Sequence, residues 1–140
     1  MPEIINHQDK IRLETNIFQT FAESVLDETA IGKTATIAFV SDRKMRQLNL
    51  EFRGKDMTTD VLSFPFEADE FEIDESFLGD IVISLEQAQR QALENHFTLE
   101  NEVKQLILHG ILHLLGYDHE TDSGEMNKLE LQLRKSLKIN

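Results

Sequence analysis

The chain has 140 residues, 40% of them hydrophobic, which suits one domain spanning residues 1–140. It contains no cysteine, which excludes a disulfide framework and thiolate ligands, so any metal site must use His, Asp, Glu or backbone groups. The formal net charge of −12 argues against a protein that binds nucleic acid through its overall charge, because phosphate affinity comes from Lys and Arg.

The charge is distributed unevenly along the chain. Residues 43–55 hold five basic residues and one acid, whereas residues 67–75 hold six acids and no base. The first ten residues lack the basic and apolar regions of a secretory signal. The most apolar stretch, LILHGILHLL, is much shorter than the roughly 20 residues of a membrane span. We therefore expect a cytoplasmic protein with no membrane partner.

The first third of the chain predicts helices and strands in alternation. A short strand is indicated at 3–6, and apolar residues at every fourth position predict a helix over 8–27. The β-branched and aromatic run TATIAFV predicts a strand at 34–40. Ser41 can then cap a helix through 42–52.

The middle of the chain predicts two strands and a helix. VLSFPF at 61–66 places alternate apolar residues on one face, and Pro65 puts this strand at a sheet edge or near the end of its pairing. GDIVIS at 79–84 is a short apolar strand. Ser84, with a glutamine three residues later, forms a capping box for a helix that ends near residue 96.

Two further helices complete the predicted fold. Thr98 can cap a helix that runs to about Leu115, and Gly116 ends it in the left-handed conformation. A last helix follows Ser123. The order of elements is not a clean alternation of strand and helix, and it favours an α+β fold in which helices pack on a small mixed β-sheet.

Three of the five histidines lie within eleven residues. His109 and His113 are one helical turn apart, with Cβ atoms about 6 Å from each other, so both imidazoles can reach one ion at about 2.0–2.1 Å. The turn at Gly116 brings the chain back and delivers His119. The spacing predicts a three-histidine metal site on a central helix and the following turn.

Such a site has chemical consequences. Three protein ligands leave a fourth position for water, which is the catalytic rather than the structural arrangement. Water bound there can ionise near neutral pH. The three histidines suit zinc, nickel, copper or cobalt, and the residues by themselves do not select among these ions.

Gly110 bears on which reaction the site performs. The spacing H-x3-H-x2-G-x2-H matches the ligands of metzincin proteases, which place their general-base glutamate directly after the first histidine. Gly110 occupies that position, which argues against proteolysis by this mechanism. It lies on the apolar face of the helix and predicts a close approach to a strand. That face comprises Val103, Leu106, Ile107, Gly110, Ile111 and Leu114, while Leu108, Leu112 and Leu115 cover another side.

A basic motif, RGKD, contains Arg53 and Lys55 and follows the predicted helix at 42–52. An arginine and a lysine beside a metal site suit a phosphate, because a guanidinium binds two of its oxygens and a fixed cation stabilises developing charge. Arg53 can equally pair with Asp56 or Asp60 and stabilise a helix C-terminus. The residues alone leave both interpretations open.

Three motifs resemble the YbeY-type endoribonucleases, a family of rRNA maturation factors. They are RGKD..TDVLSFPF at 53–66, LGDIVIS at 78–84 and HGILHLLGYDH at 109–119, in the family's order, and the resemblance covers roughly residues 46–120. The chain departs from the commoner Tyr, basic residue and Pro of the pattern at Phe52, Met57 and Thr58.

This resemblance implies a zincin-like α+β domain and a zinc-dependent endoribonuclease that acts on single-stranded RNA. It further implies a role in maturing the 3′ end of 16S rRNA and in ribosome quality control, with the ribosome or ribosomal proteins as partners. The family's zinc ligands match His109, His113 and His119, with one ion per chain, and its functional arginine matches Arg53.

Together these inferences predict metal-assisted cleavage of a phosphodiester. Arg53 would bind the scissile phosphate, with Lys55 as a second candidate, while the ion polarises a phosphate oxygen, activates water, or both. Asp118 is expected to orient one of the histidines. Tyr117 is expected to pack on its own helix rather than stack on a base.

An acidic protein should bind free RNA poorly, so we expect targeting to depend on the ribosome or a protein partner. The acidic segment 67–75 is either a solvated loop or a contact for a basic ribosomal protein. Two alternative functions remain at this stage. One is a non-catalytic ribosome-assembly factor with a structural metal, and the other is a metzincin-like metalloprotease.

Overall fold

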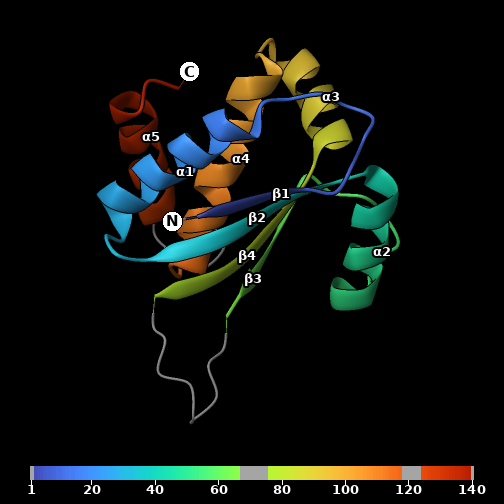
Figure 1. Ribbon diagram of the computed structural model, residues 1–140, viewed down its shortest axis with the longest axis horizontal. Helices are drawn as coiled ribbons and strands as arrows, with labels where there is room; N and C mark the ends of the chain where they lie inside the picture. The colour runs from blue at the N-terminus through green and yellow to red at the C-terminus, as the bar shows by residue number, and fades with distance from the viewer. Residues whose placement is uncertain (1, 67–75, 118–123, 140) are drawn as a thin grey trace.

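The computed structural model describes residues 2–66, 76–117 and 124–139 (Figure 1). The element order matches the predicted order, and the short N-terminal strand is present. The elements are β1 (Glu3–Asn6), α1 (Thr15–Thr29), β2 (Thr34–Val40), α2 (Asp42–Arg53), β3 (Val61–Pro65), β4 (Phe77–Ser84), α3 (Leu85–Asn95), α4 (Leu99–Leu114) and α5 (Glu125–Ser136). No helix in the described ranges has both the length and the apolar character needed to cross a bilayer.

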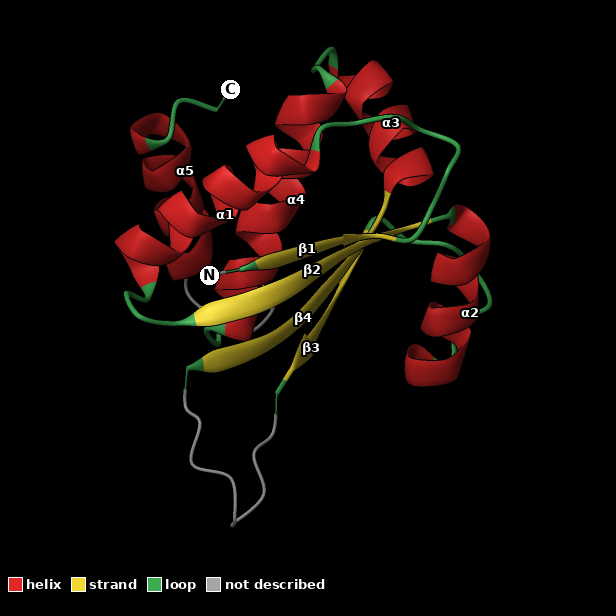
Figure 2. Ribbon diagram, in the orientation of Figure 1, coloured by secondary structure: helices red, strands yellow, loops and turns green. Residues whose placement is uncertain are grey.

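The strands form a mixed sheet in the order β1-β2-β4-β3 (Figure 2). β1, β2 and β4 are parallel neighbours, and β3 pairs antiparallel with β4 at the edge. Pro65 pairs with Gly79 at the end of β3, a position where the missing N–H of proline is tolerated. These pairings confirm the predicted α+β class and the edge position of this strand.

Helices cover both faces of the sheet, but unequally (Figure 1). α1 and α4 pack on one face and contribute most of the main core, while α2 lies on the other face. The core beneath α2 is a small cluster formed by Val40, Met45, Leu62 and Val82. The edge strand β3 therefore runs between α2 and α4, and the candidate site forms at this edge.

α4 is buried over most of its circumference, as its apolar pattern predicts. A Cβ atom added to Gly110 would lie 2.8 Å from Ile81 Cγ2, closer than real Cβ contacts come. Gly110 therefore allows α4 to approach β4, which confirms the predicted close helix-to-strand contact. His109 and His113 are half-buried on a different side of the helix.

The predicted helix over 8–27 is wrong at its N-terminal end, because α1 begins only at Thr15. The side chain of Gln8 bonds both backbone groups of Ile11: Nε2 donates to Ile11 O at 2.8 Å, and Oε1 accepts from Ile11 N–H at 2.9 Å. These bonds hold a loop in place of a first helical turn. Ile11 and Leu13 still pack against the core, which accounts for the helix-like spacing of apolar residues.

The predicted caps form, with one difference. Ser41 and Thr98 cap α2 and α4 through their side-chain oxygens. Ser84 caps α3 by accepting from Gln87 N–H at 3.3 Å. Only this half of the predicted capping box forms, because Ser84 N–H donates to Asp60 O at 3.0 Å instead. That bond joins the residue before β3 to the start of α3.

Candidate active site

The site begins with the two histidines on α4. Their Nε2 atoms lie 2.9 Å apart and their ring centroids 4.4 Å apart, so both rings direct the same nitrogen to one point. Past the end of α4, Gly116 has a φ of +98° and its N–H donates to His113 O at 3.0 Å. The helix therefore ends directly after the pair, as the sequence predicts.

A carboxylate from another helix orients the first histidine. Glu130 Oε1 on α5 lies 2.7 Å from His109 Nδ1, and the Glu130 side chain is only 16% exposed. A carboxylate here accepts a proton held on Nδ1, so the lone pair of His109 is on Nε2, where it can accept a hydrogen bond or bind an ion. His113 Nε2–H can then donate to His109 Nε2 at the observed distance.

Sequence reasoning missed Glu130 and gave the orienting role to Asp118, which lies outside the described residues. A signal for Glu130 was present. Glu130 lies four residues after Met126 and three before Leu133, two buried positions, so it is an acid on the inward face of an amphipathic helix. A carboxylate on such a face requires a partner.

The pair fits a metal ion. Two nitrogens bound at 2.0–2.1 Å in a tetrahedral site would be about 3.3 Å apart, close to the 2.9 Å between the Nε2 atoms. The carboxylate on His109 Nδ1 is the partner that ligating histidines ordinarily have. The predicted third ligand, His119, lies outside the described residues. Within them, no group of three or more His, Cys, Asp or Glu side chains could hold a metal, so the tripod stays a prediction.

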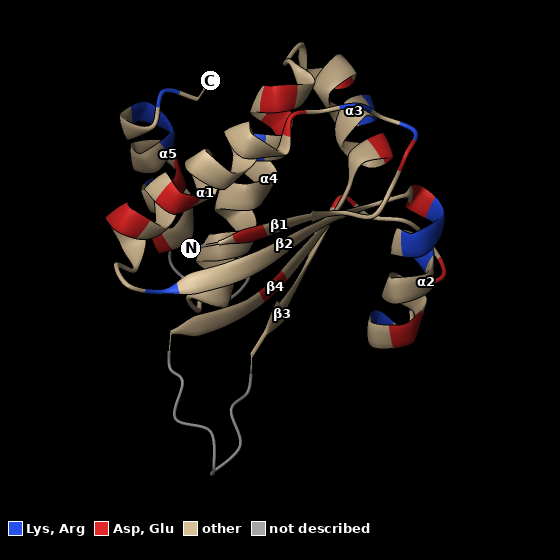
Figure 3. Ribbon diagram, in the orientation of Figure 1, with Lys and Arg blue, Asp and Glu red and all other residues tan. Residues whose placement is uncertain are grey.

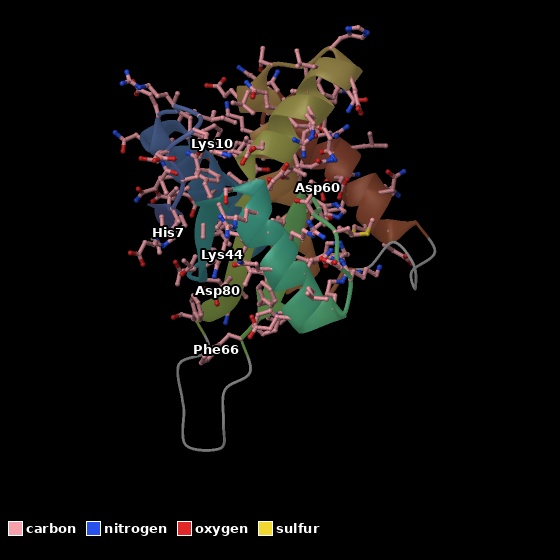
Figure 4. The ribbon with its side chains drawn as sticks, turned by 90° about the vertical axis from the view of Figure 1, so that its right-hand side faces the viewer. His7, Lys10, Lys44, Asp60, Phe66 and Asp80 are labelled. Carbon is pink, nitrogen blue, oxygen red and sulfur yellow. The ribbon has the colours of Figure 1, made fainter. Side chains whose placement is uncertain are left out.

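The histidines line a cavity of about 480 Å³ at the edge of the sheet. Arg53 reaches it from the end of α2, and β3 with the two residues before it forms one wall. The lining comprises Arg53, Thr59, Asp60, Val61, Leu62, Ser63, Pro65, His109 and His113. Figure 4 views this side of the molecule, with α2 in front and Asp60 beside it.

The structure separates the two predicted phosphate ligands. Arg53 lines the cavity, whereas Lys55 is exposed and is not among the lining residues. Asp56, one proposed partner of Arg53, instead forms two bonds with Arg46, at 2.7 and 3.0 Å. Those bonds hold the pKa of Asp56 below its usual value. Arg53 also lies in the last turn of α2, where a positive charge is favourable, so this position serves the helix as well.

The outer edge of β3 adds a backbone donor. Ser84 N–H donates to Asp60 O, and Phe66 N–H donates to Leu78 O. Because hydrogen-bonded and non-hydrogen-bonded positions alternate along an antiparallel pair, every second residue of β3 bonds to β4. Val61, Ser63 and Pro65 therefore direct their backbone groups away from β4. Pro65 has no N–H, and Val61 N–H is bonded to Asp60 Oδ1 at 2.8 Å. The Ser63 N–H is thus the amide available along this part of the cavity wall.

A second, smaller cavity lies behind His109. Its volume is about 170 Å³, and Asp60, Glu102, His109 and Glu130 are among its lining residues. Glu102 is 6% exposed and its Oε2 lacks a hydrogen-bond partner in the described structure. Burial raises the pKa of Glu102, and the charge of Asp60 raises it further. The apolar pattern of α4 gave no signal for this buried acid.

One side chain links the two acids. With its amide turned to donate, Gln91 Nε2 lies 3.3 Å from Asp60 Oδ2 and 3.1 Å from Glu102 Oε1. Tyr117, the remaining residue to which the sequence gave a possible RNA contact, is half-buried and packs against the main core. This position agrees with the packing role predicted for it.

The fold and the cleft define a class: a mixed α+β protein in which two convergent imidazoles, an arginine and a backbone amide line one cavity. These groups together suit chemistry at a phosphate ester. Comparisons with known proteins give the family.

The family model for endoribonuclease YbeY matches residues 3–138. Curated relatives described as endoribonuclease YbeY include one from Clostridioides difficile, 38% identical over 96% of this chain and 94% of that protein. Others come from Helicobacter pylori, 44% identical over 84% and 81%, and Carboxydothermus hydrogenoformans, 39% identical over 98% and 97%. The solution structure of a Thermotoga maritima protein superposes with a TM-score of 0.68 at 28% identity, over 98% of this chain and 89% of that one.

The chain belongs to the YbeY endoribonuclease family. This confirms the resemblance found in the sequence, and with it the predicted class of enzyme, a hydrolase that cuts RNA. The two alternatives, a metalloprotease and a non-catalytic assembly factor, are not favoured.

Proposed function

We propose that this protein is a metal-dependent endoribonuclease that cuts single-stranded RNA, and that it acts in maturing the 3′ end of 16S rRNA and in ribosome quality control. The observation that carries the proposal is the cavity at the β3 edge. There the converging Nε2 atoms of His109 and His113 share one space with Arg53. A metal-binding pair and a phosphate-binding cation are two components that metal-assisted hydrolysis of a phosphodiester uses.

His109, His113 and His119 would hold one zinc ion. When bound, zinc supplies Lewis acidity and lowers the pKa of a coordinated water to near 7. Glu130 keeps the proton of His109 on Nδ1 and so presents the Nε2 lone pair to the ion. The zincin-like arrangement of the third ligand is part of the proposal.

Arg53 would bind the scissile phosphate through its guanidinium fork, in the cavity that the histidine pair also lines. The Ser63 N–H on the adjacent wall is a second donor to the same phosphate. Lys55, exposed beyond the cavity, would attract the RNA chain rather than hold the reacting group. Binding at these points would hold the phosphate in the cavity that the histidine pair lines, and orientation of this kind lowers the barrier.

Gly110 supports RNA cleavage over proteolysis. Metzincin proteases carry their general base at this position, but Gly110 faces Ile81 of β4 with no room for a Cβ atom. A carboxylate there would enter the core rather than the cavity. The base of the metalloprotease mechanism therefore has no equivalent in this part of the chain.

The ribosome, or a ribosomal protein, would supply the affinity for RNA that a chain of net charge −12 lacks. A cytoplasmic location is part of the same proposal. The acidic segment 67–75, which the sequence offers as a contact for a basic partner, lies outside the described residues.

The test uses zinc-loaded protein and a labelled single-stranded RNA, alongside a His113→Ala variant purified identically. Wild-type cleavage that is lost in the variant and with a chelator would tie the activity to the histidine pair and exclude a contaminating nuclease. Equal cleavage by both proteins would point to a contaminant. No cleavage by folded, zinc-loaded wild type would refute the catalytic proposal and leave the assembly factor.

A further inference from the structure

An aromatic side chain is exposed beside the cavity. Phe52, the residue before Arg53, is 59% exposed. Its ring packs edge-on against Phe64 of β3, with centroids 5.1 Å apart and an interplanar angle of 66°. Phe64 in turn packs on the small cluster beneath α2. The sheet thus holds the Phe52 ring in position, while the larger part of its surface remains open to a ligand.

The helix that carries Phe52 has an excess of positive charge in an otherwise acidic protein. Arg43, Lys44, Arg53 and Lys55 are exposed on α2 and just after it, together with one exposed acid, Glu51, and Figure 3 shows basic residues along this helix. Arg46 is also exposed, but it is paired with Asp56. No salt bridge joins these four cations to another described residue. An exposed aromatic ring among cations is the combination that binds single-stranded nucleic acid, because the cations follow the backbone and the ring stacks on a base. The excess of positive charge on and just after α2 favours a polyanion as the partner.

The geometry of α2 separates a base contact at Phe52 from a phosphate contact at Arg53. Successive residues of an α-helix point about 100° apart around its axis. Phe52 lies against Phe64, whereas Arg53 lines the cavity with the histidines. A base on Phe52 would therefore lie outside the cavity, on a nucleotide next to the one whose phosphate is cut.

We propose that Phe52 is a stacking platform for an unpaired RNA base that flanks the scissile phosphate. This inference rests on the proposed function, since it assumes an RNA chain held at Arg53. It assigns the α2 side of the β3 edge as the path of the substrate. Recognition there would be by the face of the base, so it would tolerate different bases but not a duplex or a missing base.

The chain contains no tryptophan, so Phe52→Trp would introduce a single tryptophan as a fluorescent reporter at the platform. The matched control is Ile31→Trp, at a position 82% exposed on the connection between α1 and β2. Figure 1 places that connection at the opposite end of the sheet from α2. Both variants would be titrated, metal-free and at low salt, with single-stranded oligoadenylate RNA and an abasic strand with the same number of phosphates.

Stacking predicts saturable quenching of the Phe52→Trp fluorescence by oligoadenylate and little quenching by the abasic strand. The Ile31→Trp fluorescence should change with neither strand. Anisotropy of labelled oligoadenylate should show that Phe52→Ala binds about 5- to 150-fold more weakly, the range expected for one lost base–aromatic stack. Phe52→Tyr, which keeps the ring, should bind like the wild type. Thermal unfolding of each variant identifies any loss caused by the contact with Phe64.

Three outcomes would overturn the inference. If the RNA binds while the Phe52→Trp fluorescence is unchanged, or is quenched equally by the abasic strand, no base stacks there, although the endoribonuclease proposal would stand. If Phe52→Ala binds RNA normally but loses affinity for ribosomal particles, Phe52 contacts a protein. If wild type neither binds nor cuts single-stranded RNA, the proposed function fails and the platform fails with it.

Discussion

Glu130 Oε1 and His109 Nδ1 lie 2.7 Å apart and connect the C-terminal helix α5 to the histidine pair on α4. The two residues are twenty-one positions apart in the chain, so the contact depends on the packing of two helices. It determines which nitrogen of His109 faces the cavity, and four predictions follow from this and neighbouring contacts.

Removal of the Glu130 carboxylate should weaken metal binding. In Glu130→Ala, His109 loses the acceptor that holds its proton on Nδ1, and zinc affinity should fall about 10- to 100-fold. Competition with a chromogenic chelator would measure this affinity. Glu94→Gln, which removes an exposed carboxylate from α3, is the control. If wild type, Glu130→Ala and Glu94→Gln bind zinc with affinities within a factor of two, Glu130 does not contribute to zinc binding.

Arg53 and Lys55 should differ in their effect on RNA cleavage. Arg53→Ala removes a cation from the cavity, and kcat should fall by about 10²- to 10³-fold, as for a lost donor to a developing charge. Arg53→Lys keeps the charge without the guanidinium fork, so its kcat should lie between those of wild type and Arg53→Ala. Lys55→Ala should weaken RNA association less than about tenfold, with an effect that disappears at high salt. Comparable losses of kcat in the two alanine variants would contradict the separation of roles.

Gly110→Ala should destabilise the fold through contact with Ile81. Overpacking costs about 1–3 kcal/mol, which exceeds the roughly 0.5–1 kcal/mol that alanine gains over glycine in a helix. Urea denaturation should therefore show a lower free energy of unfolding. In an Ile81→Ala background the three nearest side-chain atoms are absent, and the same change should be neutral or stabilising. An equal loss of unfolding free energy in both backgrounds would show that contact with Ile81 is not the cause of the destabilisation.

Glu102 should make stability depend on pH. Burial, and then the charge of Asp60, raise the pKa of Glu102, so the folded state holds this proton more tightly than the unfolded state. The resulting stabilisation is complete below the unfolded-state pKa, about 4.3, and is lost as the pH rises through the pKa of the folded state. Glu102→Gln cannot ionise, so its free energy of unfolding should increase relative to wild type as the pH rises above the unfolded-state pKa of about 4.3. Urea denaturation at stepped pH measures the difference.

Asp60→Asn provides the matching control, because it removes the charge that is the second cause of the raised Glu102 pKa. In an Asp60→Asn background, the free energies of unfolding measured with Glu102 and with Glu102→Gln should therefore diverge over a narrower pH range. A difference that stays constant with pH would mean that Glu102 is ionised equally in the folded and unfolded states.

Local features of the fold were predictable because neighbouring residues determine them. Ser41, Ser84 and Thr98 each bond an N–H three residues later, and Gly116 takes the positive φ that ends α4. The start of α1 was wrong because the apolar spacing continues through a loop in which Gln8 bonds Ile11. Those two bonds depend on one side chain and not on any periodic pattern.

The sequence by itself determined that His109 and His113 share one side of a helix, since the helical repeat places residues four apart on the same side. It also determined the family, through motifs that lie in contiguous stretches. Only the tertiary structure decided that Arg53 lines one cavity with this pair while Lys55 does not, and that Glu130 and Asp60 line a second cavity with His109. Those relationships depend on how β3 lies between α2 and α4 and how α5 packs on α4. Sequence periodicity predicts local structure only, so it does not predict contacts between elements that are far apart in the chain.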